Sequence, residues 1–150
     1  MGSGDFHPIG LVLHTGKPLA MLDPYSGAAE EMSFERIERI LRQRFGLIMS
    51  SQDCQSFGIL IGEKPGQMRR TLALRMKRML EKHGKKGYLL ALEHIGPDLI
   101  DFYPVDAFVN TACPRIAIDD DRKPLITPFE LEVALGEKQW ETGYMFDEIP

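Results

Sequence analysis

The chain has 150 residues, enough for one domain with a core of its own, and its apolar and charged fractions are those of a globular protein. Its formal net charge of −4 at pH 7 gives no overall field that would attract nucleic acid or an anionic membrane. The sequence contains neither an apolar run of the ~20 residues needed to span a membrane nor a signal-peptide pattern. We therefore expect a cytoplasmic protein with no membrane partner and no direct nucleic-acid partner.

The first third of the chain alternates short apolar runs with turn residues. Residues 6–14 predict a short helix, and residues 18–22 predict a short buried strand that ends in a turn. Ser33 is placed to cap a longer helix running to about residue 51, although Gly46 could mark a break. Its apolar side chains recur at helical spacing, at positions 34, 37, 41, 45 and 48.

The rest of the chain alternates apolar runs with helical patterns. Continuous apolar runs predict buried strands at residues 57–61, 88–92 and 107–110. Helical spacing predicts a helix that starts at Met68 and stops at Gly84, a short helix at residues 97–102, and a helix at residues 128–135 that stops at Gly136. Residues 124–126 predict a short extended piece, and we expect the aromatic tail after Gly136 to lie over the body.

This alternation of strands and helices predicts the fold class. We expect an α/β domain of three layers, with a roughly four-stranded parallel sheet flanked by helices. The architecture would be Rossmann-like, but the GxGxxG motif is absent, which argues against an ordinary dinucleotide site.

The loop after residues 107–110 carries the densest set of reactive side chains. It holds Cys113, then Arg115, then the carboxylates of residues 119–121. Open α/β sheets keep their sites at the carboxyl ends of strands, so a reactive or metal-binding cysteine is one interpretation. The residues alone leave open a free cysteine in an ordinary loop and a solvated acidic turn.

A second candidate is the loop at residues 63–67, which lacks the Walker A pattern. Gly66 and Gln67 at a helix start could bind an anion through backbone N–H groups and a side-chain amide, or could simply be solvated. His7 and His94 fall in loops at the same predicted edge, whereas His83 suits a helix C-terminal cation. Cys54 has no metal-ligand spacing to Cys113, so any further ligands of a metal site would come from outside this chain.

Several stretches together carry a resemblance to a known family. They are residues 6–11, 17–18, 23–25, 57–59, 64–67, 106–120 and 123–128 with Glu130, and the most specific is Asn-Thr-Ala-Cys-Pro-Arg-Ile at residues 110–116. In this order they resemble the C-terminal (third) domain of the archaeal diphthamide synthase family, the 2-(3-amino-3-carboxypropyl)histidine synthases. The opening residues also look like a loop that follows a strand, so we expect part of a longer, three-domain enzyme.

The resemblance implies a 4Fe-4S cluster held by one cysteine from each of three similar α/β domains, with Cys113 as the ligand from this one. It implies that the reduced cluster cleaves S-adenosylmethionine to a 3-amino-3-carboxypropyl radical, which adds to a histidine of translation elongation factor 2. Methylthioadenosine is left. The full-length enzyme is expected to be a homodimer.

The resemblance also suggests roles for other residues. Arg115, Gln67 and Gly66 would bind the amino-acid end of S-adenosylmethionine, and His7 would line the same edge. The carboxylates of Asp119 and Asp120 would hold the cysteine loop in shape.

Two of the three cluster cysteines are absent from this sequence. We therefore expect the chain alone to be inactive and its Cys113 to be an unligated thiol. Two alternatives remain at this point. One is a non-catalytic partner subunit that supports the cluster or docks the elongation factor, and the other is another three-domain iron–sulfur enzyme such as quinolinate synthase.

Overall fold

A computed structural model describes residues 9–12, 17, 19–22, 27–62, 69–92, 102–112 and 123–140 of the chain. The chain divides into two compact units, residues 1–45 and 46–150, and the boundary falls within helix α2 (Phe34–Gln52). Each unit is described by itself below. The expected place of the chain as one domain of a three-domain enzyme stays a prediction.

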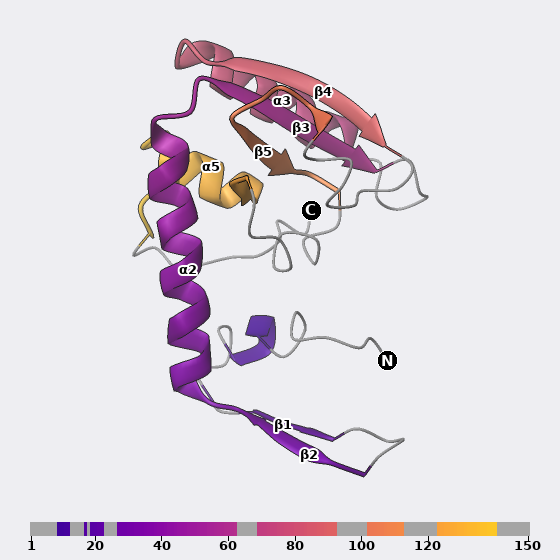
Figure 1. Ribbon diagram of the computed structural model, residues 1–150, viewed down its shortest axis with the longest axis vertical. Coiled ribbons are helices and arrows are strands. Elements are labelled where there is room, and N and C mark those ends of the chain that lie inside the picture. Colours follow the sequence, from indigo (N-terminus) through magenta and orange to yellow (C-terminus); the bar gives the residue numbers. More distant parts are fainter. Residues whose placement is uncertain are drawn as a thin grey trace. The chain divides into compact units, whose positions relative to one another are not determined.

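The first unit contains a two-stranded antiparallel sheet (Figure 1). Strand β1 (Leu19–Leu22) pairs with β2 (Ala29–Met32), with Leu19 opposite Met32 and Leu22 opposite Ala29. The prediction of a buried strand at residues 18–22 was wrong in its burial, because Leu22 is 70% exposed. No strand was predicted at β2, whose sequence Ala-Glu-Glu-Met has no apolar alternation and becomes a strand through its pairing with β1.

Helix α2 begins where Ser33 was predicted to cap it. The Ser33 hydroxyl accepts a hydrogen bond from the backbone N–H of Arg36 at 3.3 Å. The helix continues through Gly46 without a break. Ile37 and Ile48 of the predicted apolar stripe are buried, but its phenylalanines, Phe34 and Phe45, are largely exposed.

The second unit contains a four-stranded parallel sheet in the order β4-β3-β5-β6. The strands are β3 (Ser56–Gly62), β4 (Lys86–Leu92), β5 (Ala107–Asn110) and β6 (Leu125–Ile126). The predicted fold class, a four-stranded parallel α/β sheet with flanking helices, is therefore confirmed. The fourth strand is β6, which the sequence predicted only as an extended piece.

The position of β4 differs from the prediction of a buried strand. It lies at the edge of the sheet, where it pairs only with β3 on one side. Tyr88 is 49% exposed and Leu89 39% exposed, whereas all four residues of β5 are buried. An apolar run predicts a strand but does not give its place in a sheet, and edge strands expose what central strands bury.

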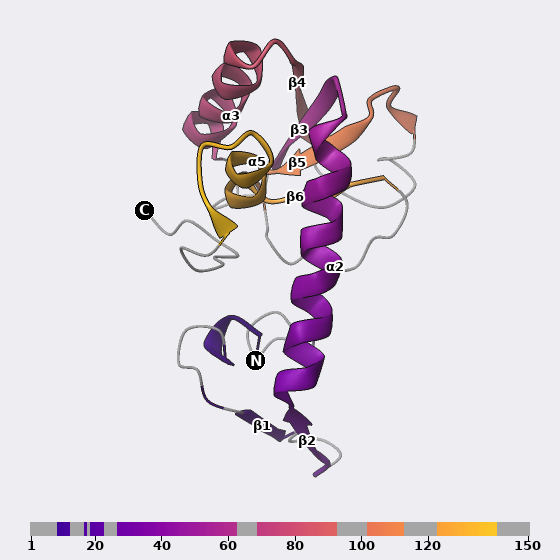
Figure 2. The same ribbon diagram turned by 90° about the vertical axis from the view of Figure 1, so that its left-hand side faces the viewer.

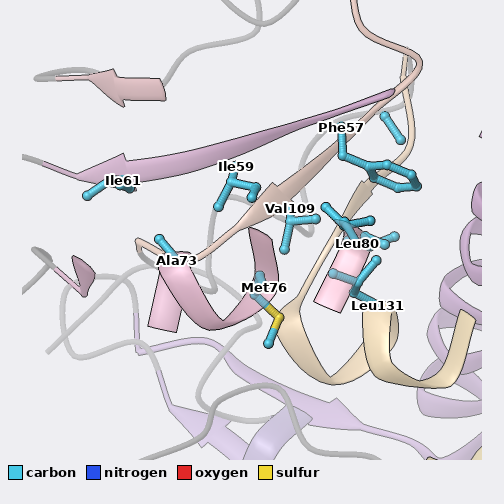
Figure 3. Packing of buried hydrophobic residues seen from close by; sticks show 10 residues of the cluster. Phe57, Ile59, Ile61, Ala73, Met76, Leu80, Val109 and Leu131 are labelled. Carbon is cyan, nitrogen blue, oxygen red and sulfur yellow. The ribbon is translucent and has the colours of Figure 1, made fainter. Parts of the chain in front are cut away.

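Two helices cover one face of this sheet, namely α3 (Arg70–Lys82) and α5 (Pro128–Ala134) (Figure 2). Ile59 and Val109 point from neighbouring strands toward Met76 of α3 and Leu131 of α5 (Figure 3). Both helices end as predicted, at glycines that take positive φ values, 72° at position 84 and 74° at position 136.

The opposite face of the sheet carries a smaller apolar cluster. It consists of Leu60, Val105, Phe108 and Leu125, with Tyr103, Leu90 and Leu92 packed against it. Because alternate residues of β3 and β5 enter the two clusters, both central strands are buried on both faces. Within the described residues, no helix is long and apolar enough to cross a membrane.

Candidate functional site

The carboxyl ends of the parallel strands lie at one edge of the sheet. There β3 ends at Gly62, β5 at Asn110 and β6 at Ile126. The last ladder pair between β3 and β5 joins Leu60 to Asn110, so the segments that follow these two strands leave the sheet from neighbouring positions. This is the edge at which parallel α/β sheets place their ligands.

The side chains predicted to form the site lie outside the described residues. This holds for Cys113, Arg115, Gly66, Gln67 and His7, and also for His94 and the aspartates at positions 119–121. Their roles therefore stay predictions. The structure instead shows the strand ends from which the two predicted loops depart, up to Gly62 on one side and Ala112 on the other.

Three residues that directly precede Cys113 are held by specific hydrogen bonds. The backbone N–H of Thr111 donates to the Leu60 carbonyl at 3.1 Å, and the Thr111 hydroxyl donates to the same oxygen at 2.7 Å. The side-chain oxygen of Asn110 accepts the backbone N–H of Ala112 at 3.0 Å. Asn110, Thr111 and Ala112 are all at most 3% exposed.

In the sequence this stretch stands out for its cysteine, and the hydrogen bonds of Asn110 and Thr111 were not predicted. A usable signal was present, because asparagine commonly bonds the backbone two residues onward and so starts a turn. The Thr111 bond was not predictable, since it depends on the register between β3 and β5.

The carboxyl end of β6 leads directly into α5 through a capping box. The Thr127 hydroxyl accepts the N–H of Glu130 at 3.3 Å, and a Glu130 carboxylate oxygen accepts the N–H of Thr127 at 2.7 Å. Both residues are at most 1% exposed. This end of β6 is thus held by reciprocal bonds within the chain.

The amino edge of the sheet carries a different polar cluster, centred on Asp106. One carboxylate oxygen accepts the Ser56 hydroxyl at 2.7 Å, the Ser56 N–H at 2.8 Å and the Gln55 N–H at 3.0 Å. The Ser56 hydroxyl, followed by these backbone N–H groups, holds the pKa of Asp106 below its ordinary value. The cluster joins the start of β3 to the segment before β5.

Cys54 lies near this amino edge, and its thiol is free and half-buried. Burial, followed by the charge of Asp106, raises the pKa of the thiol above its ordinary value, which disfavours the thiolate form. No group of three or more histidine, cysteine or acidic side chains gathers as a metal site in the part of the chain that the structure describes.

His83 is the C-cap residue of α3, as its predicted place near the helix C-terminus requires. Its Nε2 lies 2.9 Å from a carboxylate oxygen of Glu137, which also accepts Lys82 Nζ at 2.8 Å. Lys82 and then His83 hold the pKa of Glu137 below its ordinary value. This cluster joins the end of α3 to the segment after α5.

The fold and the strand ends define an α/β domain of the parallel-sheet class, and in the sequence Cys113 follows the end of its buried central strand β5 by three residues. A family model described as "Putative diphthamide synthesis protein" matches residues 1–145. The chain belongs to this family, and the resemblance predicted from its sequence is confirmed.

Individual relatives give the same result. The 2-(3-amino-3-carboxypropyl)histidine synthase of Pyrococcus horikoshii is 38% identical over 152 residues, which cover 99% of this chain and 43% of that protein. The synthase of Methanocaldococcus jannaschii is 29% identical over 154 residues, covering 99% and 44%. Subunit 1 of the Homo sapiens synthase is 29% identical over 152 residues, covering 98% and 34%.

A solved structure is similar in fold as well as in sequence. It is the crystal structure of Dph2 from Pyrococcus horikoshii with a 4Fe-4S cluster, with a TM-score of 0.84 and 37% identity over 99% of this chain. The match covers 42% of the Dph2 chain. The chain thus spans less than half the length of the relatives and the structure that it matches.

Proposed function

We propose that this chain is the C-terminal domain of a 3-amino-3-carboxypropyl transferase that carries out the first step of diphthamide synthesis on a histidine of translation elongation factor 2. The family membership supports the proposal, and so do the names of the relatives, which are 2-(3-amino-3-carboxypropyl)histidine synthases, and the cluster in the similar Dph2 structure. The observation that carries it is the family match over residues 1–145, which include Cys113, three residues after the end of β5 in the sequence.

The cysteine content of the chain fits a domain that would supply one ligand to a shared iron–sulfur cluster. Iron–sulfur clusters are held by cysteine thiolates, and Cys113 would supply one from the loop that follows β5 in the sequence. Cys54 does not qualify, because its half-buried thiol lies near the amino edge and its pKa is raised. Cys113 would therefore hold one iron, and the remaining cysteines would come from the rest of the full-length enzyme.

The same edge would bind the amino-acid end of S-adenosylmethionine. Arg115 would pair with the substrate carboxylate, while the backbone N–H of Gly66 and the side-chain amide of Gln67 would donate to it. His7 would line the site. Bound there through Cys113, a reduced cluster would supply the electron needed to break the bond between the substrate's sulfur and its γ-carbon.

The proposal is tested by replacing each cysteine in the full-length protein. After anaerobic reconstitution, Cys113→Ala should lower the bound iron and abolish release of methylthioadenosine. Cys54→Ala is the matched control and should leave both unchanged. Iron content and methylthioadenosine release that stay at the wild-type level in Cys113→Ala would refute the proposal.

The proposed role of Arg115 in substrate binding is tested separately from that of Cys113. Arg115→Gln should raise the KM for S-adenosylmethionine and leave the iron content at the wild-type level, because the arginine would bind the substrate and not the cluster. An unchanged KM would exclude this role while leaving the function of Cys113 standing.

The chain alone should neither assemble the cluster nor release methylthioadenosine, since it offers one thiolate at this edge. The full-length enzyme would be a cytoplasmic homodimer.

A role as a non-catalytic partner subunit is the second candidate, because several relatives are named as subunit 1 of the synthase. Activity of the full-length protein without any other subunit would exclude that candidate. The family match lends no support to quinolinate synthase.

A further inference from the structure

The ends of β3 and β5 are joined by a side-chain bond that the sheet itself does not require. The Leu60 carbonyl already accepts the backbone N–H of Thr111, which continues the ladder beyond the last paired residues. The Thr111 hydroxyl donates to the same oxygen at the shorter distance of 2.7 Å. This second donor fixes the side-chain rotamer of Thr111 and ties the end of β5 more closely to β3.

A second bond fixes the next step of the chain. The side-chain oxygen of Asn110 accepts the N–H of Ala112, so the backbone turns directly after Thr111. Together the two side chains hold three consecutive buried residues, and Cys113 follows by one peptide bond. Because consecutive α-carbons are ~3.8 Å apart, fixing Ala112 restricts where the Cys113 α-carbon can lie.

The Thr111 bond also relates the two loops that are proposed to share one site. Leu60 lies two residues before the end of β3, after which the chain enters the loop that holds Gly66 and Gln67. Thr111 lies two residues before Cys113. The Thr111 hydroxyl therefore joins the two chain segments that lead into these loops, one at residues 63–67 and the other after Ala112.

We infer that Thr111 and Asn110 are positioning residues for Cys113, and that they orient its thiolate toward the shared cluster. The inference rests on the proposed function of Cys113. Neither residue would touch iron, since both already bond the backbone around the strand ends. Removing a group that holds a metal ligand in place typically lowers the affinity for the metal by about 10- to 100-fold.

The competing explanation is that these bonds only stabilise the sheet. Ser51 allows the two explanations to be separated, because its hydroxyl donates to the Leu47 carbonyl at 2.7 Å and the residue is 1% exposed. It matches Thr111 in burial and bond length. It lies near the end of α2, which leads to the amino end of β3, whereas Thr111 bonds Leu60 near the carboxyl end of that strand.

The experiment uses the full-length protein carrying Thr111→Val, Thr111→Ser, Asn110→Ala, Ser51→Ala or Cys113→Ala. Valine keeps the shape of threonine and leaves the backbone bond to Leu60 in place, so the fold should survive. Two quantities are measured, the rate at which the reconstituted cluster loses iron to a chelator and the melting temperature of the cluster-free protein. The second readout reports fold stability without the cluster.

Thr111→Val and Asn110→Ala should lose iron roughly tenfold faster than the wild type. Thr111→Ser keeps the hydroxyl and should behave like the wild type. Ser51→Ala should lower the melting temperature as Thr111→Val does while losing iron at the wild-type rate. If Thr111→Val does not fold, Thr111→Ala is compared with Thr111→Ser in the same way.

Two results would overturn the inference, and they are distinguishable. Equal rates of iron loss in Thr111→Val and Ser51→Ala, with Cys113→Ala still losing its iron, would show that the bonds only stabilise the sheet. Full iron retention in Cys113→Ala would refute the proposed function and the positioning role with it.

Discussion

The carboxylate of Asp106 accepts two hydrogen bonds from Ser56, one from its hydroxyl at 2.7 Å and one from its backbone N–H at 2.8 Å. The two residues are 50 positions apart in the sequence, so the pair fixes the starts of two neighbouring strands to each other. The bonds favour the ionised carboxylate, which is why the pKa of Asp106 lies below its ordinary value of 3.8.

A lowered carboxyl pKa gives a definite dependence of stability on pH. The contribution of Asp106 to the free energy of unfolding is fully present above the ordinary pKa and is lost as the pH falls through the lowered pKa. Ser56→Ala removes the largest cause of the shift, so the pKa of Asp106 should rise toward 3.8. The measurement is an NMR titration of the Asp106 carboxyl carbon in both proteins. Asp106→Asn should weaken the dependence of the free energy of unfolding on pH at acidic pH. A carboxyl group of Asp106 that titrates at its ordinary pKa in the wild type would contradict the lowered pKa.

Gly58 is a position in β3 where the core leaves no room for a side chain. A Cβ there would lie 2.7 Å from the ring of Phe108 and 2.9 Å from Leu90 Cδ1. Because Phe108 is fully buried, Gly58→Ala should destabilise the protein by about 1–3 kcal/mol, measured as the free energy of unfolding in urea.

Gly46 provides the control for that substitution. A Cβ at Gly46 would meet nothing within 4 Å, and the residue lies inside helix α2. Gly46→Ala should therefore stabilise the protein by up to about 1 kcal/mol, since alanine is favoured over glycine in a helix interior. A loss of stability in both variants would argue that crowding against Phe108 is not what destabilises Gly58→Ala.

The sequence predicted the elements of this fold better than their positions. The helix ends at Ser33, Pro128, Gly84 and Gly136 were predicted correctly, because capping and positive φ depend on a few local residues. Strand β2 was missed and β4 was assigned to the interior. Both errors concern pairing between distant segments, which local pattern does not encode.

The candidate site shows the same division. Its neighbours in the sequence marked Cys113 as a candidate, but its predicted role as a cluster ligand came only from the family resemblance. Spacing alone did not separate a ligand from a free thiol. The bond from Thr111 to Leu60 spans 51 positions, so it depends on strand register and was not predictable from the cysteine loop itself.

Glu132 is a buried carboxylate of α5 that holds α3 in place. Its side chain is 2% exposed and accepts a hydrogen bond from Arg75 of α3. Lys138 Nζ lies 2.6 Å from Oε2, close enough for an ion pair, although Oε2 accepts no hydrogen bond. The carboxylate thus depends on two cations for its charge compensation.

Removing one of these cations should be costly. Arg75→Ala should lower the free energy of unfolding by about 1.5–3 kcal/mol, the range for a hydrogen bond to a charged group. Arg42→Ala breaks an exposed pair with Glu38 at 3.1 Å on α2 and should cost no more than about 0.5 kcal/mol. Combining Arg75→Ala with Glu132→Gln should cost less than the sum of the single changes, and strict additivity would show that the pair does not interact.

Thr127 begins α5 and carries half of a fully buried capping box. Thr127→Ala removes the acceptor for the N–H of Glu130, which has no access to water as a replacement. The expected loss is about 1–2 kcal/mol, at the upper end for a cap because the freed donor stays buried. Ser33→Ala at the half-buried start of α2 removes a single bond of the same 3.3 Å length and should cost less. Urea unfolding of the two variants measures the difference, and an equal loss would mean that burial of the capping box adds nothing to its strength.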